Sequence, residues 1–175
     1  KELKVIQRRI SELSIAFSNN ITDNTDTLFI NEELLGGLPE DYKSQRIQSD
    51  GRYAIDLSNP SFYPFMKYAD SDSLRKILRL KYLNIGYPEN IEILDSIILN
   101  SNKLATILGY SSYAAYSMEQ SMAQTPAVVW EFENSLRKRI EEKAYLDIQE
   151  LLMIKRKITD KENVIINDWD KHYYE

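Results

Sequence analysis

The sequence predicts a mainly α-helical fold with one small β-strand or hairpin element. Three observations support this. Apolar residues recur at spacings of three and four over most of the 175 residues, the chain has only five glycines and five prolines, and strict apolar–polar alternation is confined to one short stretch. Spacings of three and four place apolar side chains on one face of a helix, whereas alternation places them on one face of a strand.

The first predicted helix lies at the start of the chain and ends at Asn19-Asn20. Its apolar stripe consists of Leu3, Ile6, Ile10, Leu13 and Phe17. Residues 28–30 then form a short apolar run, a candidate strand, ahead of a turn at Gly36-Gly37. Pro39 suits the first turn of a helix, where the acidic residues that follow it are also favourable.

The clearest strand pattern follows a turn signal at Asp50-Gly51. Tyr53, Ile55 and Leu57 alternate with polar or small residues, and the pattern ends before Asn59-Pro60. Alternation of this kind predicts a half-buried strand. Since only one or two strands are visible in the whole chain, any sheet must be small.

From Pro60 onward the pattern is almost entirely helical. The apolar face of the first helix in this region consists of Phe62, Phe65, Met66 and Ala69. Aromatic residues between Tyr53 and Tyr68 resemble a ligand platform, but their mixed spacing favours core packing. Ser73 is predicted to cap the next helix, which Gly86-Tyr87-Pro88 ends.

Two further helices are marked by capping residues. Asn90 is predicted to cap a helix that closes with Gly109 as the first residue beyond its end. Ser111 or Ser112 is then predicted to cap a helix that runs through Met122. The polar caps and the glycine stop are the local signals that separate these helices from their neighbours.

Thr125-Pro126 opens the longest predicted helix, which runs to Thr159, with Thr125 as the capping residue. Its apolar stripe consists of Val129, Phe132, Leu136, Ile140, Ala144, Ile148 and Leu151 or Leu152. Such a helix is roughly 50 Å long at 1.5 Å per residue. No repeat, low-complexity tract or flexible linker divides the sequence, so residues 1–175 are predicted to form a single helical domain.

The charge pattern argues against nucleic acid as a partner. The net charge is −5 and the pI is about 5.1, whereas phosphate binding needs a concentrated basic face. The two densest basic runs, residues 137–139 and 155–157, are explained by a solvated helix face and by a helix end.

The longest strongly apolar run, residues 97–99, is too short to span a bilayer, so no membrane partner is expected. Residues 1–4 do not form a secretory signal. The chain also has no cysteine, which excludes disulfides and thiolate sites and fits a reducing compartment. A cytoplasmic location is therefore expected. The first residue already lies inside a helical pattern and is not Met, which suggests a fragment or a processed product.

The residues themselves predict no catalytic, cofactor-binding or metal-ligating site. A catalytic zinc generally takes three protein ligands from His, Cys and carboxylates, and this chain offers one histidine, His172, and no cysteine. A Ser-His-Asp triad would have only His172 as its base, and its place near the end of the chain favours a surface residue. Gly36-Gly37 lacks the Gly-Lys-Ser/Thr of a phosphate loop. The carboxylate pairs Glu32-Glu33 and Glu141-Glu142 point to different sides of a helix.

Six stretches, in order along the chain, resemble segments of the zinc peptidases of the thimet oligopeptidase and dipeptidyl carboxypeptidase family. They are Glu33–Glu40, Gly51–Pro60, Phe65–Tyr68 with Leu74-Arg75, Leu104–Ala114, Met122–Phe132 and Asp168–Tyr174. The fourth is similar to the family's "xAxLLGYxxyA" block. The last resembles the "WDxxYY" segment that leads into the catalytic half. The order of the blocks spans about 140 residues.

The resemblance implies that the chain is a fragment of a zinc metallopeptidase, a hydrolase that degrades short peptides. In the family the metal motif lies C-terminal to the "WDxxYY" segment, so no zinc ligand or catalytic glutamate carries over to this chain. The chain then belongs to the N-terminal, channel-wall half, which admits short peptides and rejects folded proteins. Zinc would be bound by the full-length parent, and the chain alone should be inactive.

Two other readings remain open at this point. The chain is alternatively a self-standing helical interaction module, in which residues 125–159 present a binding groove. It is alternatively a divergent relative without activity. In the fragment reading, apolar helix faces should pack against the missing catalytic half. The isolated chain should then expose a large apolar patch and is able to dimerise through it. Whether the parent cleaves internally or removes C-terminal dipeptides is left open.

Overall fold

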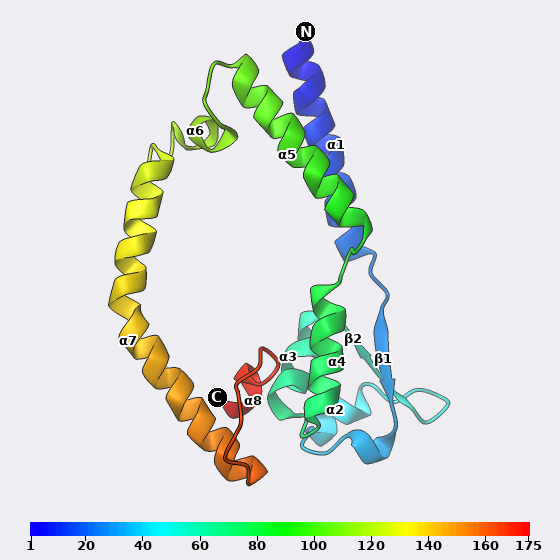
Figure 1. Ribbon diagram of the computed structural model, residues 1–175. Coiled ribbons are helices and arrows are strands. Elements are labelled where there is room, and N and C mark those ends of the chain that lie inside the picture. Colours follow the sequence, from blue (N-terminus) through cyan, green and yellow to red (C-terminus); the bar gives the residue numbers. More distant parts are fainter. The chain divides into compact units, whose positions relative to one another are not determined.

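The computed structural model describes residues 1–175 and confirms a mainly helical fold: eight α-helices, one short 3-10 helix and one two-stranded antiparallel sheet (Figure 1). The residues group into two compact units. Unit 1 consists of residues 1–24 and 86–143, and unit 2 of residues 25–85 and 144–175. The single helical domain over residues 1–175 stays a prediction. None of the helices combines the length and apolarity that crossing a membrane requires.

Unit 1 is built on two long helices, α1 (Glu2–Thr22) and α5 (Glu89–Ile107), which pack along each other (Figure 1). The predicted stripe of α1 places Ile6 and Leu13 in the buried interface, and α5 contributes Leu104 and Ala105. The helical spacing of the apolar residues is therefore what brings these two segments together.

Asn90 holds the two helices together by polar contacts. The prediction that it caps α5 is wrong, because α5 begins at Glu89 and Asn90 lies in its first turn. Its Nδ2 donates a hydrogen bond to the carbonyl oxygen of Phe17 at 3.1 Å, and its Oδ1 accepts one from Asn20 at 2.8 Å. The side chain serves α1 instead of the end of its own helix.

The predicted stop at Gly109 is confirmed. Gly109 has φ +88°, and its N–H bonds to Thr106 at 3.0 Å while the N–H of Tyr110 bonds to Ala105 at 2.9 Å. This pair of bonds is a Schellman motif, which needs a residue in the left-handed region. Ser112 then caps α6 (Tyr113–Met118), with its Oγ accepting from the N–H of Ala115.

The helix predicted to run through Met122 ends earlier, at Met118. Backbone turns follow, and Met122 is fully exposed. With no apolar surface to cover Met122, nothing favours a longer helix there. The helix start predicted at Thr125-Pro126 is confirmed: Thr125 Oγ1 accepts from the N–H of Val128 at 3.4 Å, and α7 (Pro126–Thr159) has 34 residues.

Unit 2 contains the small sheet. Strands β1 (Thr27–Ile30) and β2 (Tyr53–Asp56) pair antiparallel, with Ile30 opposite Tyr53. The 3-10 helix η1 (Glu32–Leu34) and helix α2 (Glu40–Ser44) lie between them in sequence. The predicted alternation is confirmed, because Tyr53 and Ile55 are buried on one face of β2.

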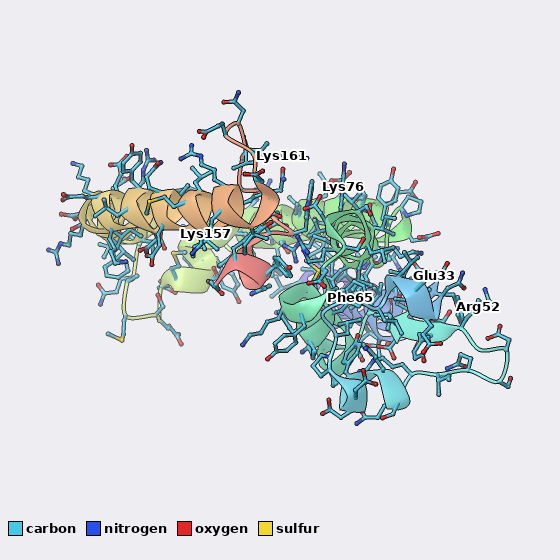
Figure 2. All side chains as sticks on the ribbon, turned by 90° about the horizontal axis from the view of Figure 1, so that it is seen from below. Glu33, Arg52, Phe65, Lys76, Lys157 and Lys161 are labelled. Carbon is cyan, nitrogen blue, oxygen red and sulfur yellow. The ribbon has the colours of Figure 1, made fainter.

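Unit 2 also contains α3 (Asn59–Tyr68), α4 (Asp72–Leu83), α8 (Lys171–Tyr174) and the part of α7 from Ala144 onward. The predicted apolar face of α3 forms the centre of the core, and Figure 2 labels Phe65 on this helix. The core consists of Ile30, Leu35, Leu38, Tyr42, Tyr53, Ile55, Leu57, Phe62, Phe65, Met66, Ala69 and Leu78. The ring of Tyr82 stacks on Phe62 at 4.1 Å.

The cap predicted for α4 is wrong by two residues. The N-cap is Ser71, whose backbone is extended and whose Oγ accepts from the N–H of Leu74 at 3.3 Å. Ser73 lies in the first turn, with its Oγ 3.1 Å from that of Ser71. Helix α4 begins earlier than predicted, at Asp72, which is favourable at a helix N-terminus.

Tyr42 makes the stability of unit 2 sensitive to alkaline pH. Its hydroxyl donates to the carbonyl oxygen of Ser61 at 2.7 Å, and burial raises its pKa to about 12, against the opposing effect of Arg46. Because a tyrosine in the unfolded chain titrates near pH ~10, the unfolded state releases its proton first. Stability from this group is therefore complete below pH ~10 and falls as the pH rises toward ~12, by about 2–3 kcal/mol.

This prediction is checked by urea unfolding of the chain and of Tyr42→Phe at pH 9 and pH 11.5. The unsubstituted chain is expected to lose more of its unfolding free energy between the two pH values than the variant, which has no proton at this position. Groups elsewhere that titrate in this range contribute equally to both proteins. Equal losses in the two proteins would show that Tyr42 is not the group responsible.

Candidate functional site around α8 and the end of α7

The C-terminal segment, residues 164–175, is tied to α3 and α4 by side chains far apart in sequence. The Nε1 of Trp169 donates to Asp72 at 3.0 Å, and the hydroxyl of Tyr173 donates to Asp70 at 2.9 Å. Arg79 and Asp168 form an ion pair. These contacts make the segment part of unit 2 and place the short helix α8 against α3.

Three buried charged side chains lie at the centre of this arrangement beside a partly buried amide. We call this group the Asp170 cluster: Arg75, Lys155, Asn167 and Asp170. Asp170 is fully buried, and its Oδ2 accepts hydrogen bonds from Lys155 Nζ at 2.6 Å, from the N–H of Asn167 at 2.7 Å and from the Asn167 side chain at 3.0 Å. Burial acts to raise the pKa of Asp170, but the hydrogen bonds from Lys155 and Asn167 outweigh it and lower that pKa below its usual value.

Arg75 occupies the other side of the cluster and is also buried. Its Nη1 donates to the carbonyl oxygens of Ala69 at 2.6 Å and Asp70 at 3.1 Å. Its guanidinium lies 3.9 Å from the ring centre of Tyr173, and its Nη2 lies 3.5 Å from Asp170 Oδ1. The cluster therefore places two cations on opposite oxygens of one carboxylate. Oδ2 is satisfied by hydrogen bonds, whereas Oδ1 faces Arg75 as an ion pair and accepts no hydrogen bond.

His172, the one histidine, lies on α8 and is partly exposed. Its Nδ1 is 3.6 Å from a carboxylate oxygen of Glu175, and its ring packs edge-on against Tyr63 at 5.6 Å. Neither neighbour is a serine or cysteine, the nucleophiles that a histidine base activates. The position on the surface agrees with the interpretation of His172 as a surface residue.

The donor groups of the chain do not fit a zinc ion. No three His, Cys, Asp or Glu side chains are arranged so that they could hold a metal. Asp170 already accepts three hydrogen bonds on one oxygen and has Lys155 as its counter-ion, so it is not a free ligand. No metal-dependent chemical step follows from these residues.

The glycine pair and the two carboxylate pairs of the sequence lie in a turn and on helices. Gly37 has φ +80° and approaches the carbonyl oxygen of Tyr68 and the carboxylate of Asp70. This tight packing is a turn and not a phosphate loop. Glu32-Glu33 opens η1, and Glu141-Glu142 lies exposed on α7.

The hollows around α8 are small and open. One of about 270 Å³ is lined by Tyr63, Lys67, His172 and Glu175, and another of about 250 Å³ lies between the end of α7 and Tyr174. Ligand pockets usually measure about 300–1,000 Å³ and enclose most of the ligand. The hollows therefore do not indicate a small-molecule site.

Helix α7 carries a row of exposed apolar side chains. The part of the predicted stripe that precedes Leu151 is here called the α7 stripe and consists of Val129, Phe132, Leu136, Ile140, Ala144 and Ile148. Phe132 is 64% exposed, and Leu136, Ile140 and Ile148 are each at least 41% exposed. Lys155 is the one residue of α7 that is buried, whereas Lys157, labelled in Figure 2, is exposed. A regular apolar stripe left in solvent is typical of a surface that packs on another protein segment.

Sequence reasoning missed the Asp170 cluster. The sequence pattern indicates Lys155 as a cation at a helix end, and Arg75 and Asp170 stand out only as parts of the segments that resemble the family. No local pattern marks the three as partners, because Arg75 and Asp170 are 95 residues apart. The one available signal is that Asp170 lies between Trp169 and the pair Tyr173-Tyr174.

The comparisons with known proteins agree with the resemblance found in the sequence. The model of peptidase family M3 matches residues 65–175. Saccharolysin of Saccharomyces cerevisiae is 30% identical over 185 residues, which cover 99% of this chain and 26% of the yeast protein. A thimet-like oligopeptidase of Dictyostelium discoideum is 29% identical over 178 residues, covering 99% of this chain and 26% of that protein.

A bacterial relative gives the same result. Oligopeptidase A of Haemophilus influenzae is 32% identical over 162 residues, which cover 83% of this chain and 24% of the bacterial protein. The chain thus spans about a quarter of the length of the curated relatives it matches.

Proposed function

The chain belongs to peptidase family M3, and we propose that it forms a non-catalytic helical region of a larger oligopeptidase, where it shapes the passage by which short peptides reach the catalytic centre. Two of these relatives are named as oligopeptidases, and the chain matches about a quarter of their length. This supports a peptidase parent in which other residues carry the chemistry.

The observation that carries the proposal is the α7 stripe. A 34-residue helix with one buried residue has no core of its own in this chain. Burial of its exposed aromatic and aliphatic side chains would stabilise an assembly by roughly 25 cal/mol per Å² of apolar surface removed from water. We therefore propose that the stripe packs against the catalytic part of the same peptidase. A passage walled by such helices would admit unfolded peptides and exclude folded proteins sterically.

We further propose that the catalytic zinc and its ligands lie outside these 175 residues. The chain has one histidine and no cysteine, and no three of its His, Asp or Glu side chains are grouped so that they could supply three protein ligands. On this proposal the chain contributes shape and packing, and the parent contributes hydrolysis. A cytoplasmic location and the absence of nucleic-acid and membrane partners stay predictions from the composition.

Self-association of the isolated chain tests the proposed role of α7. With its partner surface absent, the chain is expected to dimerise at micromolar concentrations through the α7 stripe, as measured by sedimentation velocity over a concentration series. Substituting Phe132, Leu136 and Ile140 together by serine should restore a monomer, because these changes remove the apolar side chains without disturbing buried contacts.

The matched control substitutes three exposed apolar residues of α1 and α5, Val5, Ile15 and Ile98, by serine. The control should dimerise as the unsubstituted chain does. A clean monomer of the unsubstituted chain at every concentration would count against the proposal that α7 presents an uncovered packing surface.

The α7 stripe also fits the alternative function, a self-standing helical interaction module without peptidase activity. The two proposals differ in the partner. A module should bind an unrelated protein with a defined stoichiometry, whereas a peptidase region should bind the catalytic part of an M3 peptidase. Titration of the chain with the separately produced catalytic part of oligopeptidase A distinguishes them.

A further inference from the structure

We propose that Asp170 is a positioning residue that fixes the C-terminal end of α7 on the body of unit 2, and that it acts through the ammonium group of Lys155. The role of this attachment in shaping a peptide passage rests on the proposed function, because a helix that walls a passage needs a fixed attachment. The attachment itself is argued from the contacts of the Asp170 cluster.

Helix α7 has a single buried residue, Lys155. Its Nζ donates to Asp170 Oδ2 at 2.6 Å and to the carbonyl oxygen of Ile165 at 3.0 Å, and it lies 5.6 Å from the ring centre of Tyr174. An ammonium group is removed from water only where such partners replace its hydration. The position of Lys155, and with it the last turns of α7, is therefore set by these oxygens.

Asp170 is itself contacted from the opposite side by Arg75. Arg75 faces its other oxygen at 3.5 Å, and Arg75 is fixed by two backbone carbonyls in the connection between α3 and α4. A continuous series of polar contacts thus runs from this connection through Arg75, Asp170 and Lys155 to α7. Asp170 is the member that touches both cations.

Helix α7 also makes apolar contacts at the place where these polar contacts hold it. Leu151 and Ile154 of α7 line a shallow hollow with Tyr174, and both are only half-buried. Half-buried side chains on a hollow give little geometric constraint, whereas a desolvated ion pair is directional and strongly penalises any displacement that separates the charges. The ionic contact, and not the apolar one, should therefore determine where α7 is attached.

Hydrogen exchange of the 175-residue chain, followed by mass spectrometry, tests the inference. The region measured is residues 150–159 at the end of α7. Lys155→Met and Asp170→Asn are each expected to accelerate exchange there by about tenfold or more, the scale that follows from breaking a buried ion pair. The double variant should exchange no faster than the faster single variant, because both changes remove the same contact.

Two variants separate positioning from general destabilisation. Lys155→Arg keeps the cation and should retain most of the protection. Asp168→Asn removes a more exposed carboxylate of the same segment, which pairs with Arg79, and should change exchange in residues 150–159 by less than about twofold. If Asp170→Asn unfolds unit 2, which faster exchange in α3 would reveal, Lys155→Met alone decides the question.

Exchange in residues 150–159 that stays unchanged in Lys155→Met, or that rises equally in Asp168→Asn, would overturn the inference. The measurement uses no peptide and no catalytic partner. Its result therefore stands or falls separately from the proposed function, which the sedimentation experiment tests. If hydrogen exchange supports the attachment but the chain does not self-associate through α7, Asp170 remains a positioning residue. The proposed role of α7 in a peptide passage would then be lost.

Discussion

Replacing Gly37 by alanine is expected to destabilise unit 2 by roughly 4 kcal/mol or more, which is exceptional for a single methyl group. Gly37 has φ +80°, where an L side chain costs about 1–2 kcal/mol. The added Cβ would also lie 2.1 Å from the carbonyl oxygen of Tyr68 and 2.7 Å from Asp70 Oδ1. The first neighbour is backbone and cannot rotate away, and the N–H of Asp70 is bonded to the carbonyl of Gly36 at 3.0 Å.

Gly51→Ala is the matched control for this prediction. Gly51 has nearly the same backbone conformation, φ +81°, but a Cβ there would meet nothing within 4 Å. The Gly51→Ala substitution should therefore lower the free energy of unfolding only by the cost of a positive φ for an L side chain, about 1–2 kcal/mol. The free energies of unfolding are measured by urea denaturation of both variants and the unsubstituted chain. Equal losses in the two variants would contradict the close approach of Gly37 to Tyr68.

The sequence predicted the elements whose signals are local. The stripe of α1, the glycine stop at Gly109 and the start of α7 at Thr125-Pro126 were all confirmed, because periodicity and capping act over a few residues. The strand at Tyr53 was confirmed for the same reason, since alternation alone identifies a half-buried strand.

The two wrong caps show where local signals stop being sufficient. Ser71 and Ser73 are chemically equivalent candidates, and the choice between them depends on where the backbone leaves α3. Asn90 has the chemistry of a cap, but contacts with Phe17 and Asn20, some 70 residues away, take up its side chain. In both cases tertiary structure determined the outcome, and the sequence pattern does not contain that information.

The Asp170 cluster was out of reach of sequence reasoning for a related reason. Charged residues are exposed by default, so a lysine near a helix end and an arginine on a helix predict solvated side chains. Their burial depends on a chain reversal after Thr159 that brings Asp170 back to α4. By contrast, the family resemblance was visible in the sequence, because it depends on the order of short segments and not on contacts.

The second large effect expected is the absence of hydrolysis by the isolated chain. Enzymes accelerate their reactions by about a millionfold or more, so loss of the catalytic ligands should reduce peptide cleavage to the uncatalysed level. The single histidine, the lack of cysteine and the occupied carboxylate of Asp170 leave no donor set that would fix zinc and activate water.

The most direct test of the central claim combines metal analysis and peptide cleavage on one sample. The purified 175-residue chain is incubated with zinc, freed of unbound metal by gel filtration, and assayed with an internally quenched peptide in the presence and absence of a zinc chelator. Oligopeptidase A serves as the positive control. We predict zinc at the level of the buffer blank and no cleavage above background. One zinc per chain together with chelator-sensitive cleavage would contradict the account.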